Sequence, residues 1–169
     1  LYHLETLILK NRSKLKNLPS KVRNLVSLHF LDIRGADSIE RMPSGFDQLT
    51  KLQTLSNFIM GKGDGHLIRE LKILSNLRGG FCPSGLDNVN GRDAREFKLN
   101  DKLGINGLEL HWSTNLENYS RKKEVEELKS MCWTLFVLRK SLSNSLLRMT
   151  VVQNSRLGWM ILPSRICCL

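Results

Sequence analysis

The segment LETLILKNRSKLKNLP at residues 4–19 is followed by LHFLDIRGADSIERMP at residues 28–43, and both carry the same apolar pattern. At an offset of 24 residues, six landmarks of the first segment coincide with six of the second: Leu4, Leu7, Leu9, Leu15, Leu18 and Pro19 fall on Leu28, Leu31, Ile33, Ile39, Met42 and Pro43. The match continues at the same offset, where Leu25, Leu28 and Leu31 fall on Leu49, Leu52 and Leu55. Self-similarity at one such period is typical of stacked structural repeats.

The spacing within each repeat predicts its shape. Leu-x-x-Leu-x-Leu places two apolar residues two positions apart, as in a short strand with one buried face. One coil cannot cover its own leucines, so neighbouring coils must stack. We therefore predict an α/β leucine-rich-repeat solenoid, with short parallel strands on a concave face and loops and short helices on the convex face. An amphipathic helix also fits the leucine spacing and is expected at residues 67–77, but it does not explain the matching prolines.

The side chains between the strand leucines are predicted to stand in solvent on the concave face. They form the candidate protein-binding face: Thr6, Ile8 and Lys10 in the first repeat, Phe30, Asp32 and Arg34 in the second, Thr54 and Ser56 in the third, and Glu109 and His111 in a later strand. On this reading, reversing the charges of Asp32 and Arg34 alters partner binding and leaves the fold intact.

Charge and cysteine content divide the chain. All sixteen acidic residues lie at or before Glu127, so the last 39 residues carry five of the 26 Lys and Arg and none of the acids. The same tail holds three of the four cysteines, Cys132, Cys167 and Cys168. We divide the chain into regular repeats at 1–60, an irregular segment with helices at 61–127 and a divergent tail at 128–169. Neither a disulfide framework nor paired Cys-x-x-Cys units are present, which favours a reducing compartment.

Two long stretches resemble the leucine-rich-repeat region of plant disease-resistance proteins of the coiled-coil NB-ARC class. They are residues 4–62, which include both repeats, and residues 67–112, LIRELKILSNLRGGFCPSGLDNVNGRDAREFKLNDKLGINGLELHW. In that family a helix, a strand and a second helix interrupt the coils before a Leu-x-Leu-x-Trp strand, which here is Leu108, Leu110 and Trp112. The chain departs from the usual pattern at Arg12 and Ala36, where many such repeats carry Asn or Cys in a side-chain ladder.

The resemblance implies an intracellular immune receptor, acting in the cytoplasm or nucleus. The repeats of such a receptor would bind a pathogen effector or a host protein and contribute to autoinhibition through its own nucleotide-binding domain. The chain begins in mid-pattern at Leu1, so we expect it to be a partial domain of a longer protein. No apolar run reaches the roughly 18 residues of a membrane span.

The family pattern stops after Ser130. Reading back-translated codons from the third base of the Met131 codon can restore a Leu-x-x-Leu-x-Ile strand and a Gly-x-x-x-Pro-x-Trp turn. We therefore interpret residues 131–169 as a frameshifted tail, with a divergent but genuine C-terminus as the alternative. A frameshifted tail is expected to be poorly ordered and to add no coil to the stack.

The sequence predicts no enzyme, no cofactor and no metal site. GKGDG at residues 61–65 lacks the Gly-Lys-Ser/Thr order of a phosphate-binding loop and is expected to be a surface turn. His3, His29, His66 and His111 are scattered without metal-ligand spacing. Two alternatives to protein recognition stay open: a truncated or pseudogenic product without function, and nucleic-acid binding by the basic run Lys10, Arg12, Lys14, Lys16, Lys21 and Arg23.

Overall fold

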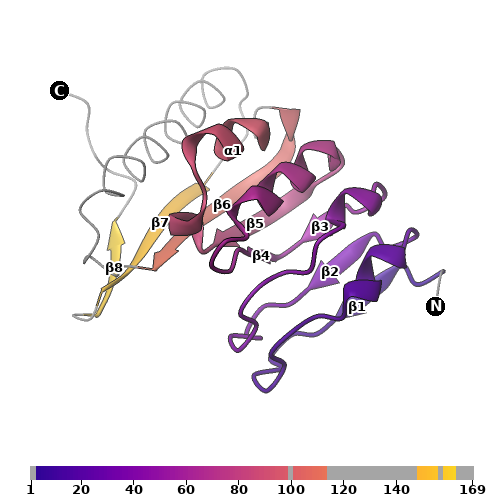
Figure 1. Ribbon diagram of the computed structural model, residues 1–169, viewed down its shortest axis with the longest axis horizontal. Helices are drawn as coiled ribbons and strands as arrows, with labels where there is room; N and C mark the ends of the chain where they lie inside the picture. Colours follow the sequence, from indigo (N-terminus) through magenta and orange to yellow (C-terminus); the bar gives the residue numbers. More distant parts are fainter. Residues whose placement is uncertain (1–2, 99–100, 114–147, 156–157, 163–169) are drawn as a thin grey trace.

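The computed structural model describes residues 3–98, 101–113, 148–155 and 158–162 (Figure 1). The strands lie side by side in chain order, and they form two sheets. The first sheet contains β1 (Thr6–Ile8), β2 (Phe30–Asp32) and β3 (Thr54–Leu55). The second sheet contains β4 (Asn57–Ile59), β5 (Arg78–Ser84), β6 (Gly104–Ser113), β7 (Arg148–Ser155) and β8 (Gly158–Leu162). No described helix has the length and apolar character needed to cross a bilayer.

The first sheet confirms the predicted repeat. Its strands are parallel, and Leu7 pairs with Leu31, which in turn pairs with Leu55, so the register equals the period of 24 residues. Leu31 and Leu55 are almost completely buried, while Leu7 at the edge of the sheet is partly buried. The apolar landmarks of the sequence are therefore stacked one above another, as a leucine-rich-repeat solenoid requires.

Short 3₁₀ helices carry the chain back between the strands. They are η1 (Ser20–Asn24), η2 (Phe46–Gln48), η3 (Gly65–Ile73) and η4 (Leu86–Asn88), and one α-helix follows, α1 (Gly91–Glu96). Each 3₁₀ helix buries at least one apolar residue: Val22, Phe46, Leu67 and Leu86 are all at most 5% exposed. The helix expected at residues 67–77 is thus present but is a 3₁₀ helix that ends at Ile73.

The missing side-chain ladder is replaced by main-chain contacts between coils. Ala36 lies in the core and Arg12 is exposed, so neither side chain bridges two coils through an amide. Instead, the N–H of Asn11 donates to the carbonyl of Arg34 at 2.8 Å, and the N–H of Glu40 donates to the carbonyl of Lys16 at 3.2 Å. Backbone hydrogen bonds therefore connect the first two coils beyond the ends of their strands.

The two sheets separate at Ser56 and Asn57, because the alternation of buried side chains changes phase there. Leu55 and Phe58 are both buried although they stand three positions apart, whereas regular alternation needs an even number. The strand direction continues across this irregularity: the N–H of Ser56 donates to the carbonyl of Leu31, and the N–H of Cys82 donates to the carbonyl of Ser56.

Apart from β4, the second sheet has longer strands, and it has the element order that the family resemblance predicted. A helix (η3), a strand (β5) and a second helix (α1) precede β6, whose ten residues include the Leu-x-Leu-x-Trp pattern. The register between β5 and β6 shifts by one residue: Gly79 pairs with Ile105, but Gly80 pairs with Gly107. This bulge decides which side chains of the two strands lie next to each other.

Lys102 is a buried polar residue behind β6, in the turn that leads into that strand. Its side chain is 0% exposed, and its Nζ donates to the carbonyls of Leu71 and Leu74 at 2.6 and 3.1 Å. The same ammonium lies 5.4 Å from the centre of the Phe97 ring. Burial lowers the pKa of Lys102 to about 8, since desolvation disfavours the charged form.

The tail contributes two strands, so the expectation that it adds nothing to the stack is wrong for these residues. β7 pairs with β6 in parallel, with Leu110 opposite Val151, and β8 pairs with β7 in the antiparallel direction. The boundary expected near residue 128 and the cysteines of the tail lie outside the described residues.

Candidate protein-binding face

The predicted face lies on the outward side of the strands, opposite the leucine core. Thr6, Ile8 and Lys10 are exposed, and Ile8 leaves 59% of its surface in contact with solvent. Phe30 and Thr54 are half-buried, because each is flanked by a neighbouring strand. Glu109 is exposed and His111 is half-buried. The side chain of Arg34 is 60% exposed. Eight of the ten predicted residues therefore reach the surface.

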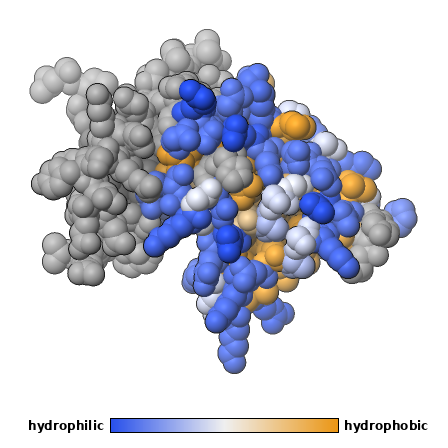
Figure 2. All heavy atoms as spheres, in the orientation of Figure 1, coloured by the Kyte–Doolittle hydropathy of each residue, from blue (hydrophilic) through white to orange (hydrophobic). Residues whose placement is uncertain are grey.

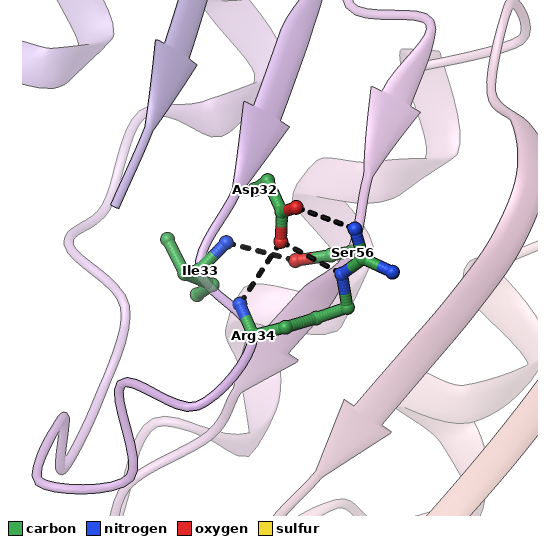
Figure 3. Close-up of polar contacts among 4 residues, drawn as sticks. All are labelled: Asp32, Ile33, Arg34 and Ser56. Carbon is green, nitrogen blue, oxygen red and sulfur yellow. Dashed lines mark hydrogen bonds and ion pairs between the residues drawn. The ribbon is translucent and has the colours of Figure 1, made fainter. Parts of the chain in front are cut away.

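Asp32 and Ser56 correct the prediction, because both are buried. Asp32 is 3% exposed and Ser56 is 8% exposed. Figure 3 shows the reason for Asp32: the guanidinium of Arg34 folds over its carboxylate. Nε of Arg34 donates at 2.9 Å and Nη2 at 2.6 Å, and the backbone N–H of Arg34 adds a third bond at 3.1 Å. Asp32 therefore fixes the position of Arg34, and only Arg34 presents its surface to solvent.

The environment of Asp32 favours its ionised form. Hydrogen bonds from the Arg34 side chain, which outweigh the opposing effect of burial, lower the pKa of Asp32 to about 2. The same pair raises the pKa of Arg34. Both groups are consequently charged at neutral pH, and the pair is held by a bidentate contact of the kind that is strongest between Arg and a carboxylate.

The side chain of Ser56 is hydrogen-bonded to the neighbouring coil of the first sheet instead of pointing to solvent. Its hydroxyl accepts a hydrogen bond from the N–H of Ile33 at 2.9 Å, as Figure 3 shows. Counting two positions from Thr54 had placed Ser56 on the outward face. That side is correct, because the Ser56 hydroxyl contributes to the low pKa of Asp32 and so lies beside its carboxylate, but Ser56 is buried there together with Asp32.

The second sheet brings together three residues that the sequence did not connect. Cys82 on β5 lies beside Glu109 and His111 on β6, and their Sγ, carboxylate and imidazole ligand atoms all fall within 4.8 Å of one another. The bulge at Gly79 and Gly80 is the cause, because it pairs Ser84 with His111 and so places Cys82 opposite Glu109. An unshifted register would have set Cys82 against the buried Leu108. Spacing in the sequence alone carried no signal of this shift.

The cluster is not an activated cysteine nucleophile. Desolvation, followed by the nearby charge of Glu109, raises the pKa of Cys82 to about 12. A catalytic cysteine needs the opposite, a pKa lowered by a cationic neighbour or a helix N-terminus. Nε2 of His111 is 3.6 Å from the Glu109 carboxylate, which is too long for a hydrogen bond, and among the described residues it has no hydrogen-bond partner.

The structure also places two other sequence features. The predicted turn is present at residues 61–64, and Gly65 already begins η3. In this turn the N–H of Asp64 donates to the carbonyl of Gly61, and the Asp64 carboxylate lies 3.5 Å from Arg41. Figure 2 shows hydrophilic residues over most of the described part of the face in view, with apolar residues in separate patches. All six residues of the basic run are exposed: Lys10, Arg12, Lys14, Lys16, Lys21 and Arg23.

Comparison with known proteins identifies the repeats. Residues 68–134 match the family model described as R13L1/DRL21 LRRs, leucine-rich repeats. The chain is 36% identical over 93 residues to disease resistance protein RGA1 of Solanum bulbocastanum, covering 54% of this chain and 9% of that protein. It is 34% identical over 84 residues to disease resistance protein RGA2 of the same species, covering 49% of this chain and 9% of that protein.

A disease resistance protein of Arabidopsis thaliana is 43% identical over 63 residues, which cover 37% of this chain and 4% of that protein. The chain thus spans at most 9% of the length of these relatives. The family match and the stacked parallel strands together show a leucine-rich-repeat fold, and the chain is similar over about half of its length to plant disease resistance proteins.

Proposed function

We propose that the chain is a protein-recognition module of an intracellular plant immune receptor, acting in the cytoplasm or nucleus without catalytic chemistry. Its partner would be a pathogen effector, a host protein or the nucleotide-binding domain of the same receptor, and contact with that domain would contribute to autoinhibition. The outward face of the parallel strands carries this proposal, because it presents side chains from successive coils in one continuous row.

The chemistry of the face supports a protein partner. Ile8 offers apolar area at one end, Arg34 is a charged donor whose position is fixed by Asp32, and Glu109 adds an exposed carboxylate on the second sheet. Protein interfaces combine an apolar centre with charged groups in this way, and a side chain that is already held in place loses less entropy when it binds.

The experiment compares substitutions on this face with substitutions elsewhere. The probe is an NB-ARC domain of the resistance-protein family, and its binding to the full chain is measured by calorimetry or by co-precipitation. Ile8→Arg and Thr54→Arg introduce bulk and charge on the outward face. The matched control is Gln48→Arg, which adds the same side chain at an exposed position of η2.

We expect each outward substitution to weaken binding at least about tenfold, which corresponds to about 1.4 kcal/mol of binding free energy. Gln48→Arg should leave the affinity unchanged. The proposal in this form fails if the control weakens binding as much as Ile8→Arg, or if the wild-type chain binds neither this domain nor a panel of effector proteins.

Nucleic-acid binding by the basic run is tested with the same protein. Random-sequence duplex DNA should bind weakly, because charge alone is not accompanied by aromatic side chains that stack on bases. Tight binding that falls steeply with salt, and that is lost when Lys14 and Lys16 are changed to Gln, would favour that alternative function.

A further inference from the structure

The outward side of the second sheet holds a group of potential metal ligands. Cys82 offers a thiol, Glu109 a carboxylate and His111 an imidazole, and these ligand atoms all lie within 4.8 Å of one another. Each alternates with buried residues of its strand, Phe81 and Pro83 on β5 and Leu108 and Leu110 on β6. Two parallel strands in fixed register therefore hold all three ligands on one face.

The distances approach those of a tetrahedral site. Zinc bonds of about 2.0–2.3 Å place neighbouring ligand atoms about 3.3–3.8 Å apart. The separation of 3.6 Å between Nε2 of His111 and the Glu109 carboxylate already falls in that range. The remaining separations need a contraction of at most about 1.5 Å, which rotation of the exposed Glu109 side chain and small changes at Cys82 can supply.

Buried polar atoms support a ligand at this position. Nε2 of His111 is excluded from solvent and has no hydrogen-bond partner among the described residues. The same is true of Oδ1 of Asn57, which stands opposite Cys82 in the register of β4 and β5. Buried polar atoms without partners are uncommon, and an ion is one of the features that explain them.

We propose that Cys82, Glu109 and His111 bind a zinc-class divalent cation on the outward face of the second sheet. The thiol and imidazole select a borderline-soft metal over magnesium or calcium, which prefer oxygen ligands. On binding, Cys82 transfers its proton to solvent and ligates as the thiolate. Three protein ligands leave the fourth position of a tetrahedral ion for water or for a side chain of a partner.

The test uses the full chain in which Cys132, Cys167 and Cys168 are changed to Ser, so that Cys82 is the one remaining thiol. Zn²⁺ affinity is measured by competition with a chelator, and Co²⁺ is added as a spectroscopic probe. We expect one ion per chain and a thiolate-to-cobalt charge-transfer band. Cys82→Ser and His111→Ala should each reduce Zn²⁺ affinity by about 100-fold or more, beyond the effect typical of outer-shell partners.

Matched controls separate the site from general metal binding. His29→Ala removes an imidazole directly before β2, and Glu40→Gln removes a carboxylate that is exposed, like that of Glu109. Neither substitution should change the affinity. Glu109→Gln should weaken it about tenfold. If Cys82→Ser does not fold, as judged by circular dichroism, the Zn²⁺ affinities of His111→Ala and Glu109→Gln test the proposal instead. The proposal is overturned if the cobalt band is absent, or if His111→Ala binds Zn²⁺ as tightly as His29→Ala.

Discussion

The coils of the first and second sheets stack on one another in different ways. In the first sheet the strands have two or three residues, and equivalent leucines pair at a constant offset of 24. In the second, β5 and β6 have seven and ten residues, their register contains a bulge, and polar side chains such as Lys102 are buried behind them. Regular coils are stabilised by repetition, whereas irregular coils depend on particular residues.

This difference predicts which single substitutions lower the free energy of unfolding most. In the first sheet a flexible side chain at the contact between coils can move aside. In the second sheet, the corresponding contacts between coils involve backbone groups or a buried charge, which cannot move aside in this way. Four predictions test this contrast, beginning with the largest expected loss of stability.

Gly45 and Gly85 compare the two regions at equivalent points. Each precedes a 3₁₀ helix in the left-handed conformation, with φ of 95° and 73°. A Cβ at Gly45 would lie 2.8 Å from Cδ of the exposed Arg23, which can move, whereas a Cβ at Gly85 would overlap the carbonyl oxygen of Met60. We expect Gly45→Ala to lower the free energy of unfolding by about 1–2 kcal/mol and Gly85→Ala by about 3 kcal/mol or more.

Urea denaturation measures both losses. Gly79→Ala is the control within the second sheet, because its φ is also positive at 79° but a Cβ there would meet open space. It should show the conformational cost alone, about 1–2 kcal/mol. Equal losses at Gly79 and Gly85 would mean that the contact with Met60 is unimportant and that the contrast between the sheets is wrong at this point.

Lys102 makes the second sheet sensitive to alkaline pH. Its folded pKa of about 8 lies below the ordinary value of 10.5, so between these values the unfolded chain binds more protons than the native one. Stability contributed by Lys102 therefore rises as pH increases from about 8 to about 10.5, by on the order of 2–3 kcal/mol. The difference in unfolding free energy between wild type and Lys102→Met, measured across this range, should show that rise. A difference independent of pH contradicts the prediction.

Asp32 makes the first sheet sensitive to acid. Its pKa of about 2 lies below the ordinary 3.8, so its contribution is complete above about pH 4 and is lost as pH falls through about 2. Because Arg34 is 60% exposed and its attraction is screened by solvent, we expect Asp32→Asn to cost only about 1–2 kcal/mol at pH 7. The burial of Asp32 also changes the expectation from the sequence: reversing both charges should now destabilise the fold.

A double-mutant cycle with Asp32→Asn and Arg34→Gln measures the pair directly. The coupling free energy should be about 1 kcal/mol at pH 7 and should approach zero near pH 2. Coupling that persists at pH 2 would show that the two side chains interact by something other than the carboxylate charge.

Cys82 should react slowly without any effect on stability. With a pKa of about 12, its thiolate fraction at pH 8 is on the order of 10⁻⁴. In the chain that keeps Cys82 as its one thiol, alkylation by iodoacetamide at pH 8 should be at least about 100-fold slower than in the urea-unfolded protein. Comparable rates in the folded and unfolded states would show that the thiol is not desolvated.

The sequence predicted the first sheet more fully than the second, for physical reasons. The positions of Leu7, Leu31 and Leu55 specify both period and register, because identical coils must stack in phase. The same counting did not predict the burial of Ser56, because that burial depends on hydrogen bonds with Ile33 and Asp32 of the neighbouring coil. It could not bring Cys82 to Glu109, because that contact depends on a bulge that leaves no repeat in the sequence.

The antiparallel β8 makes the two edges of the strand array different. A regular coil extends such a sheet by adding a parallel strand, and β1 stands at an edge of the first sheet where another strand of that kind can be added. Beside β7 that position is taken by β8, which runs the opposite way over Gly158–Leu162. A further parallel strand could pair with β7 only if β8 were displaced. Among the described strands, one edge of the array is therefore a parallel strand and the other is an antiparallel strand.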